Sequence, residues 1–417
     1  MPKSIPPVAE KGPRFLVVGA GGIGGIVAAY LLEQGHDVTT LSTNGAIRDA
    51  IAGQGFRIRG DGSIGTVPGR AVAKLSPGEG KFDFILLATQ PPDVERAARD
   101  AAPFLKDEGA LVCFQNGLCE DRVAPIVGRS RVIGGIVAWG ATMVEPGVYD
   151  RTSSGGFQLG TLDGADDDRL RALGRALECI GPVVLTQNLV GARWSKLAIN
   201  CAISALGTVG GDRLGVLMRN RYVRRLTLEL MTEVVDVARA TNVRLEKVSG
   251  TLDLDWIALT DEDRRAAGSA SLFAKHALLL AVGARYRRLK SSMLSAIERG
   301  RTPAVDFLNG EVVTRGQKLG IPTPINAAIR DEVWAIANGK ARSSEKHLRG
   351  FFDRTRPLVE PDALRVSKEA AAKGAPPARS TEEAEPLPGA LASSSPPSSR
   401  PVAAAATNAP IEDAKSE

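Results

Sequence analysis

Residues 14–34, RFLVVGAGGIGGIVAAYLLEQ, decide the fold of the first half of the chain. A short apolar run, 14–18, meets a cluster of glycines, and apolar residues then recur with helical spacing over 23–34. This order predicts a strand, a tight turn and a helix. Further strand patterns stand at 36–41, 82–88, 109–114 and 131–139, and helical patterns separate them at 93–105 and 120–127. The alternation predicts a doubly wound α/β domain with a mostly parallel sheet.

The glycine cluster Gly19-Ala20-Gly21-Gly22-Ile23-Gly24 matches the pattern G-x-G-x-x-G, with a strand before it and a helix after it. Gly19 permits the tight turn, and Gly21 lets backbone amides approach a pyrophosphate at the positive end of the helix. Gly24 allows the helix and the strand to pack closely. The motif in this context predicts a dinucleotide-binding Rossmann domain in which residues 19–24 contact the cofactor.

The end of the second strand bears on which dinucleotide is bound. An acidic residue there would bond the ribose 2′-hydroxyl and repel a 2′-phosphate. The turn is instead Ser42-Thr43-Asn44-Gly45, and Arg48 follows one helical turn later. We therefore expect NADP(H) to be preferred to NAD(H). The alternative is that these residues only form a turn and that Arg48 is solvated.

The second half of the chain has a different pattern. Residues 190–341 contain long amphipathic stretches at 221–241, 269–288 and 304–319, which predict an all-α domain. An antiparallel pair formed by 148–149 and 156–160 is expected to close the sheet of the first domain. We expect a flexible segment at 1–13, a Rossmann domain at 14–189 and a helical domain at 190–356. Residues 357–417 are rich in Ala, Pro and Ser, which predicts a disordered tail.

The composition is that of a globular protein, with 417 residues that are 43% hydrophobic and 24% charged. A formal net charge of +6 is spread along the chain, so a small anionic ligand explains it as well as nucleic acid does. The four cysteines have neither metal-ligand nor redox spacing, and no stretch has 18 uninterrupted apolar residues. We expect reduced thiols, a cytoplasmic location and no metal, nucleic-acid or membrane partner, while a homodimer stays open.

A second motif lies in residues 194–206, WSKLAINCAISAL. Lys196, Asn200 and Ser204 are spaced four apart, so on a helix they form one polar stripe among apolar residues. Such a stripe is unfavourable to bury without partners, which suggests that it faces a polar ligand. Partial burial lowers the pKa of a lysine and makes it a plausible general acid. The alternative is a solvated helix face.

Taken together, these features resemble the ketopantoate reductase (2-dehydropantoate 2-reductase) family, which joins a glycine-rich Rossmann domain to a helical domain carrying Lys-x-x-x-Asn-x-x-x-Asn. The resemblance covers about 14–340. It includes, in the family's order, the glycine turn, Gln115-Asn116-Gly117, the stretch 146–160, the lysine helix, 291–294 and 302–324. It implies the reduction of a small α-keto acid, 2-dehydropantoate, by NADPH in pantothenate biosynthesis.

The resemblance also implies roles for individual residues. Lys196 would be the general acid, and Asn116 would touch both the cofactor and the substrate. Asn200 and Ser292 would hold the carboxylate and hydroxyl groups of the substrate, with Ser204 beside them. On the cofactor side, Thr43 and Gln90 would join residues 19–24.

Four positions depart from the family pattern. Ser204 replaces the second asparagine of the stripe, and Ala304 replaces a glutamate thought to help bind substrate. Gln90 replaces a lysine after the third strand, and Thr43 replaces an arginine after the second strand. Two alternatives to ketopantoate reduction therefore stay open: a reductase of another branched or bulkier α-keto acid, and a catalytically decayed NADP-binding regulatory protein.

Overall fold

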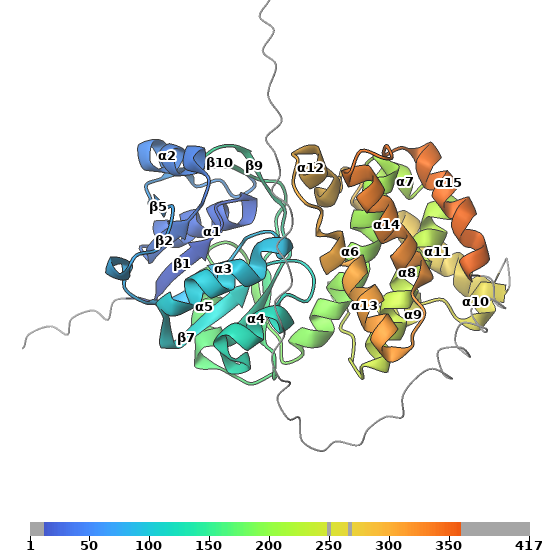
Figure 1. Ribbon diagram of the computed structural model, residues 1–417, viewed down its shortest axis with the longest axis horizontal. Coiled ribbons are helices and arrows are strands. Elements are labelled where there is room, and N and C mark those ends of the chain that lie inside the picture. Colours follow the sequence, from blue (N-terminus) through green and yellow to red (C-terminus); the bar gives the residue numbers. More distant parts are fainter. Residues whose placement is uncertain (1–11, 248–251, 266–268, 360–417) are drawn as a thin grey trace, which may run out of the picture. The chain divides into compact units, whose positions relative to one another are not determined.

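The structure is a computed structural model, and it describes residues 12–247, 252–265 and 269–359. Within this part, an α/β domain is followed by a helical domain, as the sequence predicts (Figure 1). The proposed disordered tail lies outside the described residues except for 357–359, and so does the flexible N-terminal segment except for 12–13. The domain boundaries stay predictions.

Eight strands form the main sheet, in the order β12-β11-β8-β7-β6-β1-β2-β5. Their bounds are β1 (Arg14–Val18), β2 (Asp37–Leu41), β5 (Ala71–Val72), β6 (Phe82–Leu87), β7 (Leu105–Cys113), β8 (Val132–Val137), β11 (Phe157–Thr161) and β12 (Val183–Leu185). Only the β8–β11 pair is antiparallel. The central strands are buried on both faces, which explains why β1, β6 and β8 are nearly continuous apolar runs. The prediction of a mostly parallel sheet is confirmed.

Helices cover both faces of this sheet (Figure 1). One face packs against α1 (Gly22–Glu33), α2 (Gly45–Gln54) and α5 (Asp168–Leu177), and the other against α3 (Val94–Ala101) and α4 (Glu120–Val127). Successive side chains of β1 point to opposite faces of the sheet. Phe15 and Val17 pack in the hydrophobic cluster that contains α1, α2 and α5, while Leu16 and Val18 pack in the cluster that contains α3 and α4. The carboxyl ends of the parallel strands are thereby left free to form a site.

A second sheet was not expected from the sequence. It has the order β4-β3-β10-β9, formed by β3 (Phe56–Gly60), β4 (Gly65–Val67), β9 (Ala141–Glu145) and β10 (Val148–Arg151). The predicted pairing of 148–149 with 156–160 is wrong, since β10 pairs with β9 and β3 whereas β11 pairs with β8. The tight turn at Gly147, with a φ of 75°, joins β9 and β10 directly into a hairpin.

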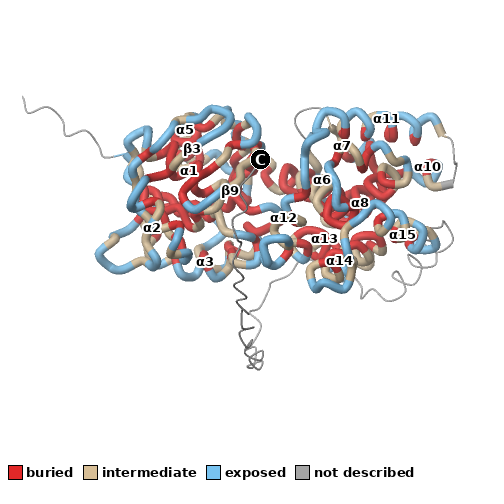
Figure 2. The backbone as a smooth tube through the Cα atoms, turned by 90° about the horizontal axis from the view of Figure 1, so that it is seen from above, coloured by how far each residue is buried: buried red, intermediate tan, exposed pale blue. Residues whose placement is uncertain are grey.

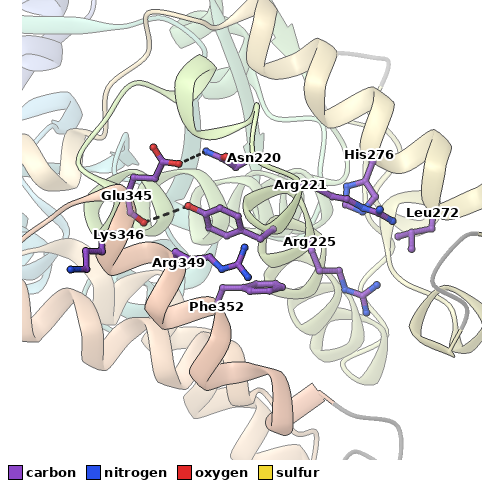
Figure 3. Close-up of a pocket in the computed structure, with 10 residues that line it drawn as sticks. Asn220, Arg221, Arg225, Leu272, His276, Glu345, Lys346, Arg349 and Phe352 are labelled. Carbon is purple, nitrogen blue, oxygen red and sulfur yellow. Dashed lines mark hydrogen bonds between the residues drawn. The ribbon is translucent and has the colours of Figure 1, made fainter.

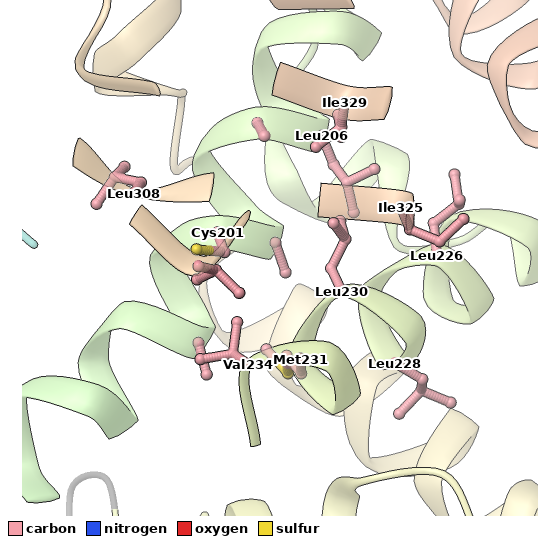
Figure 4. Close-up of a cluster of buried hydrophobic side chains, with 14 of the residues drawn as sticks. Cys201, Leu206, Leu226, Leu228, Leu230, Met231, Val234, Leu308, Ile325 and Ile329 are labelled. Atoms are coloured by element: carbon pink, nitrogen blue, oxygen red, sulfur yellow. The ribbon is translucent and has the colours of Figure 1, made fainter. Parts of the chain in front are cut away.

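In the described residues, all secondary-structure elements after β12 are helices, as predicted. The helices are α6 (Leu189–Gly210), α7 (Leu214–Leu217), α8 (Arg221–Ala240), α9 (Leu254–Ile257), α10 (Asp261–Arg265), α11 (Ala270–Arg285), α12 (Ser292–Glu298), α13 (Asn309–Leu319), α14 (Pro324–Ala337) and α15 (Glu345–Thr355). Long buried runs of α6 and α8 form the centre of this domain (Figure 2). Side chains such as Cys201 and Leu206 of α6 and Leu230 and Val234 of α8 pack there in one cluster (Figure 4).

The predicted single helix over 304–319 is two elements. A 3-10 helix, η5 (Ala304–Phe307), precedes α13, and Leu308 between them has φ −113° and ψ −95°. The break is held because the side chain of the buried Asn309 donates to the carbonyl oxygen of Cys201 at 3.0 Å and to the side chain of Asn326 at 2.9 Å. The resulting bend brings η5 to the turn at Gly117.

Two further expectations concern thiols and membranes. None of the four cysteines forms a disulfide in the structure, and Cys113, Cys119 and Cys201 are buried. That the thiols are reduced in the cell stays a prediction. None of the helices within the described ranges combines the length and apolar character needed to cross a bilayer.

Candidate functional site

The glycine turn connects β1 to α1 at the carboxyl edge of the main sheet. Gly19 has a φ of 103°, in the left-handed region that glycine adopts without strain. A Cβ atom at Gly24 would lie 1.8 Å from the carbonyl oxygen of Gly19, whereas a Cβ atom at Gly21 would meet no heavy atom within 4 Å. Gly21 is also the N-cap of α1, where no side chain caps the first amides. The turn therefore offers both space and donors, and it fits the pyrophosphate of a dinucleotide.

The turn after β2 combines local structure with a fixed cation. Asn44 caps α2 by accepting a hydrogen bond of 3.2 Å from the backbone NH of Ile47, so its side chain has a structural role. The guanidinium of Arg48 donates to the carbonyl oxygen of Ser42 at 2.9 Å, so Arg48 is held against the turn and is not merely solvated. Thr43 is exposed between them. A cation therefore lies beside the end of β2 without any acidic residue in the turn.

The lysine stripe is the one open face of α6. Apart from Val190 near its start, the residues of this helix that are not buried are Lys196, Ile199, Asn200, Ile203 and Ser204. These positions recur every three or four residues and lie on one side of the helix. Each is half-buried, so the stripe belongs neither to the core nor to a fully solvated face. The side-chain amide nitrogen of Asn200 is buried and has no hydrogen-bond partner among the described residues.

Lys196 has an unusual environment for a lysine. Its Nζ donates a hydrogen bond of 2.8 Å to the carbonyl oxygen of Val137, the last residue of β8. The pKa of Lys196 is lowered to about 7, mainly by burial and to a smaller extent by the charge of Arg193, while Glu120 opposes the shift. An ammonium group with a pKa close to neutrality can give up its proton readily. Lys196 can therefore act as a proton donor at neutral pH.

Sequence reasoning missed the buried ion pair behind this lysine. Arg193, one turn before Lys196, forms an ion pair with Glu120, and both side chains are 3% exposed. Arg193 also donates to the carbonyl oxygens of Cys113, the last residue of β7, and of Gln115, two residues later, at 2.6 Å and 2.9 Å. The pair thus fastens α6 to the strand ends. A cation three residues before Lys196 within an apolar segment was the signal for it.

The substrate-side candidates come together near the stripe. Ser291 is buried, and its hydroxyl donates to the carbonyl oxygen of Ser204 at 2.8 Å and lies 3.0 Å from the hydroxyl of Thr208. This bond fixes the start of α12 beside α6, with Ser292 exposed at the next position. The substrate-binding residues proposed from the sequence, Asn200, Ser204 and Ser292, therefore lie on neighbouring elements.

The remaining candidates follow the carboxyl ends of adjacent strands. Asn116 is exposed after β7, and Gln90 is exposed after β6. The side chain of Gln115 donates to the hydroxyl of Thr89 at 3.2 Å and so links these two strand ends. A Cβ atom at Gly117 would lie 2.5 Å from the carbonyl oxygen of Phe307, which places η5, and with it the half-buried Ala304, near this turn.

Two family models match the chain. The model described as ketopantoate reductase PanE/ApbA matches residues 15–164, and its C-terminal counterpart matches residues 188–337. Among relatives, a 2-dehydropantoate 2-reductase of Pyrococcus horikoshii is 25% identical over 329 residues, which are 78% of this chain and 97% of the relative. The uncharacterized oxidoreductase YkpB of Bacillus subtilis is 26% identical over 321 residues, 75% of this chain and 95% of the relative.

Solved structures show the same fold. A PanE/ApbA family ketopantoate reductase from Ralstonia eutropha JMP134 has a TM-score of 0.64 at 24% identity, covering 78% of this chain and 99% of that one. D-mandelate dehydrogenase in a ternary structure with NADH and anilino(oxo)acetate has a TM-score of 0.65 at 19% identity, with the same coverage. Because both halves match family models in order, the chain belongs to the ketopantoate reductase PanE/ApbA family of NAD(P)-dependent oxidoreductases.

Proposed function

We propose that the protein reduces 2-dehydropantoate to pantoate with NADPH. The observation that carries this proposal is the half-buried Lys196, whose pKa is lowered to about 7 and whose ammonium reaches the end of β8. A weakly held proton at that edge of a dinucleotide-binding sheet suits the reduction of a ketone, because the oxygen needs a proton as the carbon accepts hydride.

The order of the strands supports the placement of the cofactor. β2, β1, β6 and β7 are consecutive in the sheet, and they are followed in turn by Thr43, the glycine turn, Gln90 and Asn116. A dinucleotide bound across these strand ends would be held by the glycine turn at its pyrophosphate and by Arg48 at one end. Asn116 and the stripe of α6 would contact its other end. When bound, NADPH supplies a hydride to the keto carbon of the substrate.

The chain's own residues would perform the other tasks. Lys196 would hold a proton at Nζ and deliver it to the substrate oxygen, while Val137 accepts a second proton of the same ammonium in a hydrogen bond. The positive charge of Arg193 would help to keep the pKa of Lys196 low, so that the ammonium releases its proton readily. Asn200, with an unpaired buried NH₂ group, would donate to the substrate carboxylate, aided by the hydroxyls of Ser204 and Ser292.

Cofactor preference follows from the turn after β2. Arg48 is held by the carbonyl oxygen of Ser42, close to where a ribose 2′-phosphate would lie. The 42–45 turn contains no carboxylate that could accept a hydrogen bond from a free ribose 2′-hydroxyl. We therefore propose NADPH as the preferred cofactor.

A second substrate class is favoured by Ala304 and Ser204. Both side chains are shorter than the family's glutamate and asparagine, which leaves room and removes a carboxylate from the site. A bulkier α-keto acid would use that room, and the structurally similar D-mandelate dehydrogenase is solved with anilino(oxo)acetate, an oxamate that carries an aromatic ring beside its oxoacetate group.

The test is NADPH oxidation by the purified protein against ketopantoate, a branched aliphatic α-keto acid and an aromatic α-keto acid. The highest kcat/KM for ketopantoate is the expected result. A higher value for the aromatic acid would move the assignment to the second class. Absence of turnover with every acid, in protein that binds NADPH, would overturn the reductase proposal and favour a decayed cofactor-binding protein.

A further inference from the structure

The outer side of α11 reverses the usual pattern of a surface helix. Within 270–284, only Lys275 and His276 have side chains that can carry charge, and both are buried. Lys275 pairs there with the buried Asp263 at 2.5 Å. The exposed large side chains of this stretch are apolar instead, since Phe273 is 77% and Leu280 is 44% exposed. A surface helix normally presents polar residues to solvent, so this side of α11 is expected to have a partner.

The exposed apolar residues form one continuous face. At 3.6 residues per turn they lie within about 120° of one another around the helix. We call them the α11 face, and all six are exposed: Phe273, Ala274, Ala277, Leu280, Ala281 and Ala284.

The opposite side of α11 packs on its own domain. Leu272 and Leu279 belong to the hydrophobic cluster of the helical domain, and a Cβ atom at Gly283 would lie 2.5 Å from the Cβ atom of Met218. Leu272 and His276 also line a pocket that α11 shares with α8 and α15 (Figure 3). The helix runs along the outside of the domain (Figure 2). The α11 face is therefore turned away from the core.

The sizes of its side chains make the α11 face complementary to itself. The pair 273 with 284 and the pair 277 with 280 share one midpoint along the helix. If two α11 helices pack antiparallel about a twofold axis at that midpoint, Phe273 of one copy lies beside Ala284 of the other. Leu280 likewise lies beside Ala277 of the other copy. Each large side chain thus meets a small one, which lets two helices approach closely.

The two ends of α11 differ in charge, which favours the same arrangement. Residues 285–290 contain four exposed cations, and none of them forms an ion pair within the described ranges. At the other end, α10 carries Asp261 and Glu262, both exposed. The hydroxyl of Ser269, the N-cap of α11, donates to Asp263 at 2.8 Å and so holds α10 at this end. Antiparallel packing brings each basic end toward the acidic end of the other copy.

We propose that the α11 face binds the α11 face of a second copy of this chain, antiparallel, and that the protein is thereby a homodimer. A partner surface of one charge sign, such as an anionic membrane, would repel the acidic end at α10. A second copy complements both ends. Its contact leaves the stripe of α6 open, because the two helices present different residues of the domain.

The first test is sedimentation equilibrium of the full chain over a range of concentrations. A mass that approaches twice the 43.9 kDa of one chain is expected. Phe273→Glu combined with Leu280→Glu should weaken dimerisation by at least about a hundredfold, because the new carboxylates would be buried in the contact. Both side chains are exposed in the single chain, so the variant should keep its far-UV circular dichroism spectrum. Ser271→Glu, at an exposed position of α11 outside the face, is the control.

The second test determines the orientation of the two helices by disulfide cross-linking. In the antiparallel pair the two copies of residue 277 are about 5 Å apart along the helix axis, and the two copies of residue 284 are about 16 Å apart. A disulfide requires Cα atoms within about 7 Å of each other. Ala277→Cys should therefore form a cross-linked dimer under mild oxidation, and Ala284→Cys should not. Non-reducing electrophoresis measures both, with the wild-type chain as the background of its own cysteines.

Three results would overturn the proposal. A wild-type chain that stays monomeric at every concentration would show that the α11 face does not bind a second copy. Dimerisation of unchanged strength in the variant with both glutamates would place the contact elsewhere on the molecule. Equal cross-linking through Ala277→Cys and Ala284→Cys would show that the two helices do not run antiparallel about the proposed axis.

Discussion

The ammonium of Lys196 donates a hydrogen bond of 2.8 Å to the carbonyl oxygen of Val137, the last residue of β8. β8 lies next to β7, and Asn116 follows β7 at the same edge of the sheet. The bond therefore fixes the candidate proton donor of α6 beside the strand ends where the cofactor is expected. An ammonium has three protons, so one bond to Val137 leaves two for a substrate.

The first prediction concerns pH. The pKa of Lys196 is about 7, and only its protonated form can donate, so the rate of ketone reduction should be level below pH 7 and fall above it. The decline should approach about tenfold per pH unit. Measuring kcat/KM with saturating NADPH from pH 5.5 to 9.5 tests this. A rate that stays level up to pH 9 would contradict a donor with this pKa.

The second prediction separates binding from packing in the glycine turn. Gly21→Asp should abolish NADPH binding yet leave the fold intact, because its Cβ meets only open space while its charge repels the pyrophosphate. Gly24→Ala is the matched contrast, since its Cβ would lie 1.8 Å from the carbonyl oxygen of Gly19. We expect that variant to lose thermal stability. Fluorescence titration with NADPH and thermal melts check both, and unchanged affinity in folded Gly21→Asp would contradict the cofactor site.

How far the sequence predicted this molecule depends on the kind of signal. The strand, glycine turn and helix of 14–34 were predicted within one or two residues, because buried parallel strands and helices leave long apolar patterns. The strands that pair with β10 were not predicted, because an alternating pattern indicates a strand but does not show which strand it pairs with. The ion pair of Arg193 with Glu120 was also missed: 73 positions separate the two residues, and only the fold brings them together.

The third prediction concerns cofactor preference. Arg48→Ala should weaken NADPH binding by about tenfold while leaving NADH nearly unchanged, because in the proposed site only the 2′-phosphate would contact this guanidinium, which the carbonyl oxygen of Ser42 holds at the turn. Dissociation constants for both nucleotides in both proteins provide the measurement. Arg59→Ala, a substitution in β3, outside the 42–48 turn, serves as the control. An equal loss for NADPH and NADH would show that Arg48 supports the turn instead.

The fourth prediction tests the buried pair behind Lys196. Arg193→Met leaves the carboxylate of Glu120 buried without its cation, which should lower the free energy of unfolding by about 3–5 kcal/mol. Glu120→Gln combined with Arg193→Met removes both charges and should recover much of that loss. Removing Arg193 also removes a charge that lowers the pKa of Lys196, so the pH at which activity falls should rise. Chemical denaturation and pH profiles test the two parts, and additive losses in the double variant would argue against the pair.

The last prediction is that Lys196→Ala lowers turnover severely and leaves NADP(H) binding nearly intact. The Nζ atom of Lys196 bonds to Val137, and among the described residues no hydrogen bond or ion pair joins this side chain to the glycine turn, so cofactor affinity should not depend on it. A positioned acid contributes on the order of a hundred- to ten-thousand-fold to such a proton transfer, and kcat should fall by about that factor. Some rise in KM is expected as well, because the same ammonium attracts the keto oxygen before the reaction. Lys318→Ala, an exposed lysine of α13, is the control and should behave as wild type. Near-normal kcat for Lys196→Ala on the best α-keto acid would assign the proton to another group and leave the open face of α6 with a binding role alone.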